Sequence, residues 1–170
     1  ARTPGHDQLV LRAAARLASL SLVLALPAAA SDTAAAKSVT IRVFVMPVTR
    51  SFKDVAPRTH GTRGEYTKGD TSSGTSILQN AVRQFGKPKG ARVGTSRFVF
   101  TALSPHKARF DGLARFPGGS VHARGVSKIE GTPNVAVVGG TGVYAGATGV
   151  VEGHLLISGV QLDIIRLQIP

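Results

Sequence analysis

The sequence predicts an all-β protein folded as an eight-stranded antiparallel up-and-down β-barrel. Short apolar or alternating runs recur between segments that contain Gly, Pro and Ser, and helical periodicity is hard to find after residue 30. The connections are mostly short, so consecutive strands must be antiparallel neighbours. About eight such strands in one small domain favour a barrel or, alternatively, a sandwich.

The predicted strands follow one another from residue 39 to the end of the chain. They span residues 39–48, 76–85, 93–103, 108–116, 120–127, 134–138, 148–157 and 160–169. Residues 49–75 form the one long connection and are rich in Gly, Ser and Thr. We expect this segment to be a loop that lies as a lid across an open end of the barrel.

Residues 110–125 are predicted to form a hairpin with a two-residue turn at Pro117-Gly118. The implied register places Asp111 opposite Arg124, more simply a cross-strand ion pair than a reactive site. The other face of the hairpin carries small and aromatic side chains and is the predicted barrel interior: Phe110, Gly112, Ala114, Phe116, Val121, Ala123 and Gly125.

A glycine-rich run at residues 137–149 ends the sixth predicted strand and leads directly into the seventh. Glycine tolerates positive φ and close backbone approach, so this run predicts a sharp corner. Gly140-Thr141-Gly142 could be mistaken for a nucleotide-binding fingerprint, but that fingerprint requires a helix after the glycines. The segment that follows is β-rich instead.

Residues 1–30 are typical of a secretory signal peptide. Arg12 and Arg16 precede an apolar stretch at residues 17–26, which leads to Ala28-Ala29-Ala30 as a small-residue cleavage site. An ordinary amphipathic helix is the alternative. We expect residues 31–170 to form a single barrel domain, with no transmembrane segment in the mature chain and a secreted, periplasmic or cell-envelope location.

The composition excludes some kinds of chemistry. The chain has no cysteine, so thiol catalysis and cysteine-ligated zinc are impossible. His60, His106 and His122 lack partners at metal-ligand spacing, and we expect no metal and no cofactor. The net charge of +12 attracts anions, but the basic residues are scattered and no Trp is present, so we do not expect nucleic acid as a partner.

Three stretches are similar to the allene oxide cyclase and dirigent-protein superfamily, in that family's order. They are residues 90–95, residues 116–125 and, most specifically, residues 138–144 with Gly146 and Gly149. The resemblance implies an eight-stranded barrel with a ligand cavity, often assembled as a homodimer or homotrimer.

The chain departs from the dirigent pattern in two places. The paired aspartates that dirigent proteins usually carry in the second strand are replaced by Gln79-Asn80-Ala81, and the corner arginine by Ala145 or Thr148. The acids that would protonate a quinone-methide-like intermediate are therefore missing from those positions. Allene oxide cyclases steer a reactive epoxide in an apolar pocket, which requires shape more than a motif.

Two groups of polar residues are candidates for catalysis. Glu152 and His154 lie two apart on one strand and share a face, as a carboxylate-oriented histidine base would require; a solvent-facing polar strand gives the same pattern. Glu65, Tyr66 and Asp70 lie on the predicted lid. The candidate ligand-binding aromatics, which would otherwise be core residues, are Phe98, Phe100, Phe110, Phe116 and Tyr144.

These observations predict an exported barrel that binds a largely apolar small molecule and directs its cofactor-free cyclisation or isomerisation. The alternative is a non-catalytic small-molecule-binding or cationic envelope protein. The barrel interior distinguishes the two: a cavity of a few hundred cubic ångströms with one or two inward polar groups favours the first, and an interior filled by side chains the second.

Overall fold

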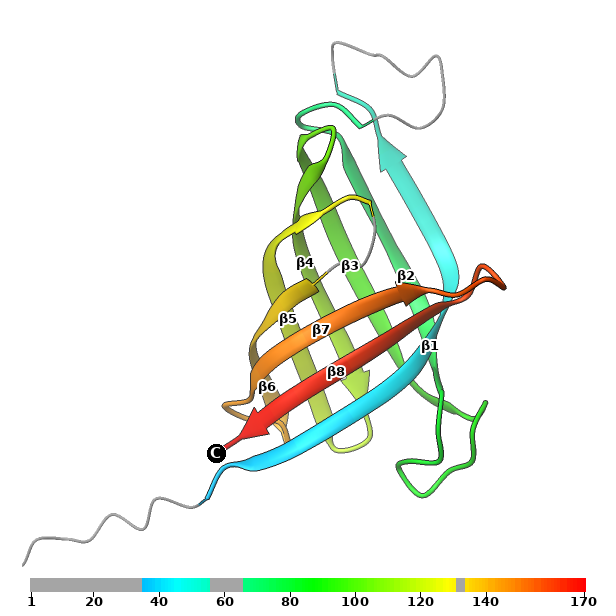
Figure 1. Ribbon diagram of the computed structural model, residues 1–170, viewed down its shortest axis with the longest axis vertical. Helices are drawn as coiled ribbons and strands as arrows, with labels where there is room; N and C mark the ends of the chain where they lie inside the picture. The colour runs from blue at the N-terminus through cyan, green and yellow to red at the C-terminus, as the bar shows by residue number, and fades with distance from the viewer. Residues whose placement is uncertain (1–34, 56–65, 131–133) are drawn as a thin grey trace, which may run out of the picture. The chain divides into compact units, whose positions relative to one another are not determined.

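Eight antiparallel strands close into a barrel in this computed structural model, which describes residues 35–55, 66–130 and 134–170 (Figure 1). The predicted signal peptide and Glu65 lie outside the described residues. The strands are β1 (Lys37–Lys53), β2 (Thr71–Asn80), β3 (Arg92–Ser104), β4 (Lys107–Phe116), β5 (Gly119–Lys128), β6 (Asn134–Gly142), β7 (Thr148–Leu155) and β8 (Gln161–Ile169).

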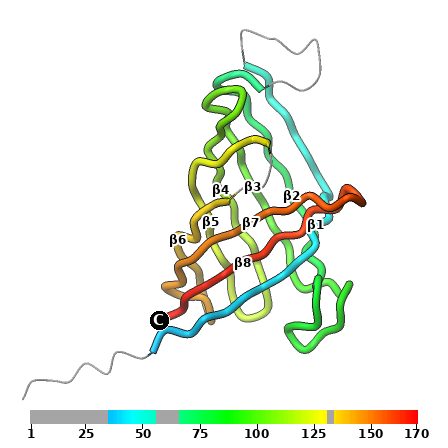
Figure 2. The backbone as a smooth tube through the Cα atoms, viewed as in Figure 1, coloured from blue at the N-terminus to red at the C-terminus, as the bar shows by residue number. Residues whose placement is uncertain are grey.

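Each strand pairs with the next one along the chain, and β8 pairs with β1 to close the barrel, as the tube in Figure 2 shows. The predicted up-and-down barrel is therefore confirmed over the sandwich. Among the described residues no helix is long and apolar enough to cross a membrane.

The predicted β4–β5 hairpin is confirmed at the level of single residues. Phe116 lies opposite Gly119 and Asp111 opposite Arg124 around the Pro117-Gly118 turn. The face predicted to be the interior does face the inside of the barrel: Val121 and Ala123 are buried, and Phe110 lines a cavity there.

One end of the barrel, where the β4–β5 turn and the β6–β7 corner lie, is filled by side chains; we call it the closed end. Its core contains buried aliphatic residues of six strands together with three aromatic rings. Phe116 stacks on Phe85 with ring centroids 5.7 Å apart and meets Tyr144 edge-on at 6.2 Å. The aliphatic part consists mainly of Ile41, Val43, Leu78, Val121, Val137, Ile165 and Leu167.

The glycine-rich run forms the predicted corner, but β6 continues through its first glycines to Gly142 instead of ending at residue 138. Gly142 has a φ of 61°, and a Cβ added there would lie 2.0 Å from the carbonyl oxygen of Gly118. The turn between β4 and β5 and the corner between β6 and β7 therefore touch backbone to backbone, which only glycine permits. This contact seals the closed end.

The prediction of a loop over residues 49–75 is wrong at both ends of that segment. β1 continues to Lys53 and β2 begins at Thr71, with pairs from Thr49↔Thr75 to Lys53↔Thr71. The side chains of residues 49–53 are exposed, so the apolar alternation that marks a half-buried strand is missing there. The connection that remains is residues 54–70.

The second strand also ends earlier than predicted, at Asn80 instead of residue 85. The side-chain amide of Asn80 donates hydrogen bonds to the backbone carbonyls of Gln84, Lys87 and Pro88 at 2.8 to 3.2 Å. Phe85 adopts a φ of 57°, outside the strand region. The buried Asn80 thus folds the following residues into a turn, and Phe85 packs on the closed-end core from that turn.

Candidate functional site

A cavity of about 360 Å³ occupies the other half of the barrel interior, toward the end where β2 and β8 begin. Residues of all eight strands line it, most of them at inward positions, and Tyr66, Lys128 and Ile129 lie at that end. The closed-end core forms its floor, and we call the opposite end of the barrel the open end. Its volume is that of a pocket for a small organic ligand.

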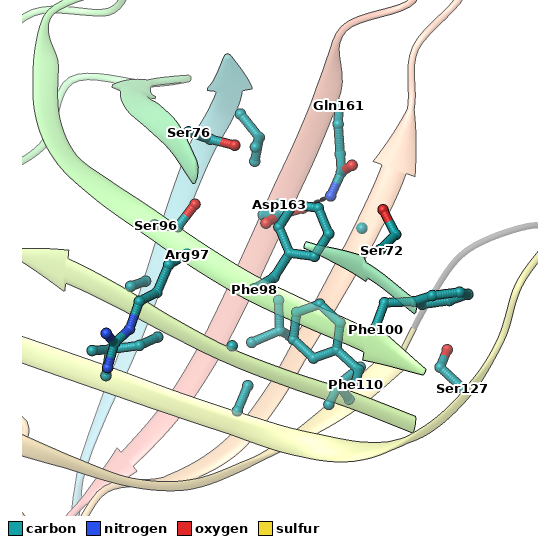
Figure 3. A pocket seen from close by; sticks show the side chains of 18 of the residues that line it. Ser72, Ser76, Ser96, Arg97, Phe98, Phe100, Phe110, Ser127, Gln161 and Asp163 are labelled. Atoms are coloured by element: carbon teal, nitrogen blue, oxygen red, sulfur yellow. Dashed lines mark hydrogen bonds between the residues drawn. The ribbon is translucent and has the colours of Figure 1, made fainter. Parts of the chain in front are cut away.

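Aromatic side chains form one wall of the cavity. Phe98 on β3 and Phe110 on β4 stack with ring centroids 6.4 Å apart and planes 7° from parallel (Figure 3). Gly112 makes this arrangement possible, because a Cβ at that position would lie 2.5 Å from the Phe110 ring. The wall is therefore flat and apolar, as a planar ligand requires.

Tyr66, from the connection between β1 and β2, extends this aromatic wall at the open end. Its ring centroid lies 5.1 Å from that of Phe100 and 5.8 Å from that of Phe52. Tyr66 also lines the cavity, so the shortened connection still contributes a side chain to its mouth.

Asp70 holds the two ends of the connection together. Its side chain is fully buried, and its carboxylate accepts hydrogen bonds from the backbone N–H groups of Val55 at 2.9 Å and Thr67 at 2.7 Å. Asp70 is not among the residues that line the cavity. The structure gives it a role in positioning Tyr66 rather than a place beside a ligand.

Among the described residues that line the cavity, Asp163 on β8 provides the one carboxyl group. Its oxygen accepts a hydrogen bond of 2.7 Å from the Gln161 side chain, drawn as a dashed line in Figure 3. Burial inside the barrel raises the pKa of Asp163 to about 6, although the hydrogen bond from Gln161 opposes this shift. Asp163 lines the cavity and is half-buried there.

Sequence reasoning missed Asp163, although a signal for it exists. Gln161 and Asp163 are in phase with Ile165 and Leu167, which are buried in the core, so they stand at inward positions of the strand. A charged residue on the apolar face of an alternating strand is the pattern to look for. Asp163 also shows that an acid is present inside this barrel.

Glu152 and His154 lie close together, as predicted, but on the outer wall of the barrel. Their neighbours Val151 and Gly153 line the cavity, so the alternating residues point outward. Glu152 pairs with Arg166 across to β8, and His154 Nε2 lies 3.7 Å from the Glu152 carboxylate. This placement matches the solvent-facing interpretation of the pair.

The five predicted ligand-binding aromatics divide into two groups. Phe98, Phe100 and Phe110 line the cavity, whereas Phe116 and Tyr144 belong to the closed-end core. Burial raises the pKa of Tyr144, whose hydroxyl lies 3.4 Å from the carbonyl oxygen of Pro117.

A second polar cluster lies on the outer wall, where Asp111 meets two basic residues. His122 Nε2 is 3.0 Å and Arg124 Nε 2.7 Å from its two carboxylate oxygens. These hydrogen bonds, first from His122 and then from Arg124, lower the pKa of Asp111. In the part of the chain that the structure describes, no three His, Asp or Glu side chains gather as metal ligands would.

No family model matches the chain, and no curated protein matches it in sequence. Solved structures do. A pyocyanin demethylase aligns with a TM-score of 0.58 and 19% identity over 76% of this chain and 99% of its own. Two pterocarpan synthase dirigent proteins align with the same TM-score. One is 16% identical over 79% of this chain and 86% of its own chain. The other is 17% identical over 78% of this chain and 94% of its own chain. The protein therefore has the allene oxide cyclase/dirigent-like barrel fold.

Proposed function

We propose that the barrel binds a largely apolar, planar small molecule in its cavity and directs a cofactor-free cyclisation or isomerisation of it. The observation that carries this proposal is that Asp163 provides the one carboxyl group among the described residues that line an otherwise mostly apolar cavity with a flat aromatic wall. A barrel interior filled by side chains would have supported a purely structural role instead.

The proposed chemistry follows from the position and pKa of Asp163. A carboxyl group with a pKa of about 6 exchanges its proton readily near neutral pH, as a general acid or base should. In an isomerisation the carboxylate takes a proton from one ligand atom and returns it to another, so no oxidant or reductant is required. The closed end excludes water, and the stack of Phe98 and Phe110 holds the ligand flat in one orientation.

The structural neighbours support a small-molecule role at the level of the fold. Their names connect one of them with pyocyanin and two with pterocarpan synthesis. Sequence identities below 20% transfer no substrate to this chain. We also propose that the protein acts outside the cytoplasm, a proposal supported by the basic, apolar and small-residue segments of residues 12–30.

The binding step is tested with 2-naphthol, a planar aromatic whose hydroxyl can donate to the Asp163 carboxylate. We expect 2-naphthol to bind in a calorimetric titration at pH 7.5, and Asp163→Asn to weaken binding about tenfold, because the neutral amide is a poorer acceptor. The matched control is Asp111→Asn on the outer wall, which should leave the affinity unchanged. Equal binding by the wild-type and Asp163→Asn proteins would remove Asp163 from the site.

Turnover is tested separately with a series of β,γ-unsaturated cyclic ketones, whose conversion to the conjugated isomers is followed by ultraviolet absorbance. The proposal predicts conversion that is lost in Asp163→Asn and kept in Asp111→Asn. Binding of these ketones without conversion would favour the non-catalytic alternative.

A further inference from the structure

The outer wall of the barrel carries a second hollow, of about 370 Å³, over β2, β3 and β4. We call it the arginine groove and define it by its principal lining residues: Val48, Ile77, Arg92, Arg97, Leu113 and Arg115. The groove lies on outward positions of the sheet and the proposed function does not depend on it, although Arg97 and Leu113 also border the cavity.

The groove has an apolar floor. Ile77 and Leu113 are half-buried on the outer faces of β2 and β4. Val48 adds a side wall, because it is the extra residue of a β-bulge in β1, between the pairs Pro47↔Ser76 and Thr49↔Thr75, and is 59% exposed. A bulge re-aims the side chain it carries, here toward the edge of the groove.

Three exposed arginines surround this floor. Arg97 lies opposite Leu113, and Arg115 lies opposite Thr95, so the two guanidinium groups belong to adjacent cross-strand rows. Arg92 lies nearer the beginning of β3. None of the three forms a salt bridge within the described parts of the chain.

Among the described residues that line the groove there is no carboxylate to balance these charges. Asp111 is the one acidic residue in β2, β3 and β4, and both of its oxygens are engaged by His122 and Arg124. Three arginines in neighbouring positions repel one another, and a ligand with two negative charges relieves that repulsion. Arginine is also suited to bidentate hydrogen bonding with phosphate oxygens.

We infer that the arginine groove binds a small free organic phosphate, with the phosphate held among Arg92, Arg97 and Arg115 and the apolar part against Ile77, Leu113 and Val48. A single soluble molecule fits better than a membrane surface. The apolar floor is recessed below the arginines in a concave hollow, whereas insertion into a bilayer requires apolar side chains that protrude.

The test uses 1-naphthyl phosphate as the probe and backbone amide NMR shifts as the readout. The expected result is a set of saturable shifts at Ile77, Thr95 and Leu113 that weaken with salt, as screening of charges requires. The double variant Arg97→Gln/Arg115→Gln should lower the affinity about tenfold or more. The control Arg109→Gln removes the same charge from the same face of β4, outside the groove, and should change the affinity about twofold at most.

Other outcomes overturn the inference. Shifts confined to cavity residues such as Asp163 would place the probe in the barrel instead, and neutral 1-naphthol in parallel identifies that mode. An equal loss of affinity in Arg109→Gln would show that the probe binds through the general surface charge and not through the groove. The wild-type protein could instead bind phosphatidylglycerol vesicles and not bind free 1-naphthyl phosphate. If the double variant then lost the vesicle binding, the groove would be a membrane-binding site. If the double variant fails to fold, each single variant must still weaken binding by itself.

Discussion

At Asp163 the stability of the fold and the proposed function have opposite requirements, because a buried carboxylate is unfavourable for folding but is needed for proton transfer. The fold places its carboxyl group on the inward face of β8, among the residues that line the cavity. Burial raises the pKa of Asp163 to about 6 in the folded state, whereas in the unfolded chain the carboxyl group loses its proton near the ordinary pKa of aspartate. Between these two values the stability of the fold must therefore fall as the pH rises.

Removing the charge at Asp163 should consequently stabilise the protein at neutral pH. We predict that Asp163→Asn raises the free energy of unfolding at pH 7.5 by about 1–3 kcal/mol, and that the gain disappears below about pH 4, where both states are protonated. Urea unfolding at the two pH values measures this difference. Lower stability of the variant at pH 7.5 would show that the carboxylate is stabilised in the fold.

Asp111 gives the opposite expectation and serves as the comparison. Its pKa is lowered by His122 and Arg124, so its charged form contributes stability above its ordinary pKa, and that contribution is lost as the pH falls through the lowered value. Asp111→Asn should therefore destabilise the protein slightly at pH 7.5, because the cluster is largely exposed. The same urea series checks the sign.

At the scale of the elements, glycines decide where the barrel is filled and where it is hollow. Gly142 allows the corner and the β4–β5 turn to seal the closed end, and Gly112 leaves room for the Phe110 ring in the cavity wall. The two positions differ in what a methyl group would meet. At Gly142 it meets backbone that cannot move, and at Gly112 it meets the far end of a side chain that can rotate.

The two glycine-to-alanine substitutions should therefore behave differently. Gly142→Ala should cost about 3 kcal/mol or more of stability, since positive φ and a backbone clash combine there. Gly112→Ala should cost less than about 1.5 kcal/mol but turn Phe110 into the cavity and weaken 2-naphthol binding about tenfold. Thermal unfolding and calorimetric titration of both variants separate these effects. Equal stability losses would contradict the distinction.

The elements also show which features of the sequence are informative. Residues 110–125 gave the correct register because charged and apolar residues alternate around an identifiable turn. Residues 49–53 and 71–75 pair outside the buried core, with polar side chains on both faces, so no alternation marked them as strands. Asp163 was missed because strand positions were assigned by their apolar members, and a single charge in phase with them was not treated as a site.

At the scale of the whole molecule, one barrel separates three environments. The closed end provides the core, the open end holds an aromatic cavity with the Asp163 carboxyl group, and the outer wall carries the arginine groove. Barrel closure and the position of the core follow from the pattern of strands and glycines. The existence of the cavity depends on how the aromatic side chains pack inside the barrel. The alternation of residues along the strands does not determine that packing. Assembly into dimers or trimers stays a prediction.

Export from the cytoplasm is a further prediction at this scale. If residues 1–30 are a signal peptide, expression with that segment in a bacterial host should give a shorter protein in the periplasmic or extracellular fraction. Its mass, measured by intact-protein mass spectrometry, should correspond to cleavage after Ala30. An uncleaved chain that stays in the cytoplasm would favour the alternative of an amphipathic helix.

We propose that Asp163 is a proton-exchanging group inside a ligand cavity. Titration of the Asp163 carboxyl group, with and without a ligand, measures this property. Carboxyl ¹³C NMR, with the Asp163 signal assigned by its loss in Asp163→Asn, gives the midpoint with and without 2-naphthol. We expect a midpoint near pH 6 for the free protein, and a lower one with 2-naphthol, because the ligand hydroxyl donates to the charged form. A midpoint at the ordinary aspartate value of about 3.9, unchanged by the ligand, would contradict this proposal.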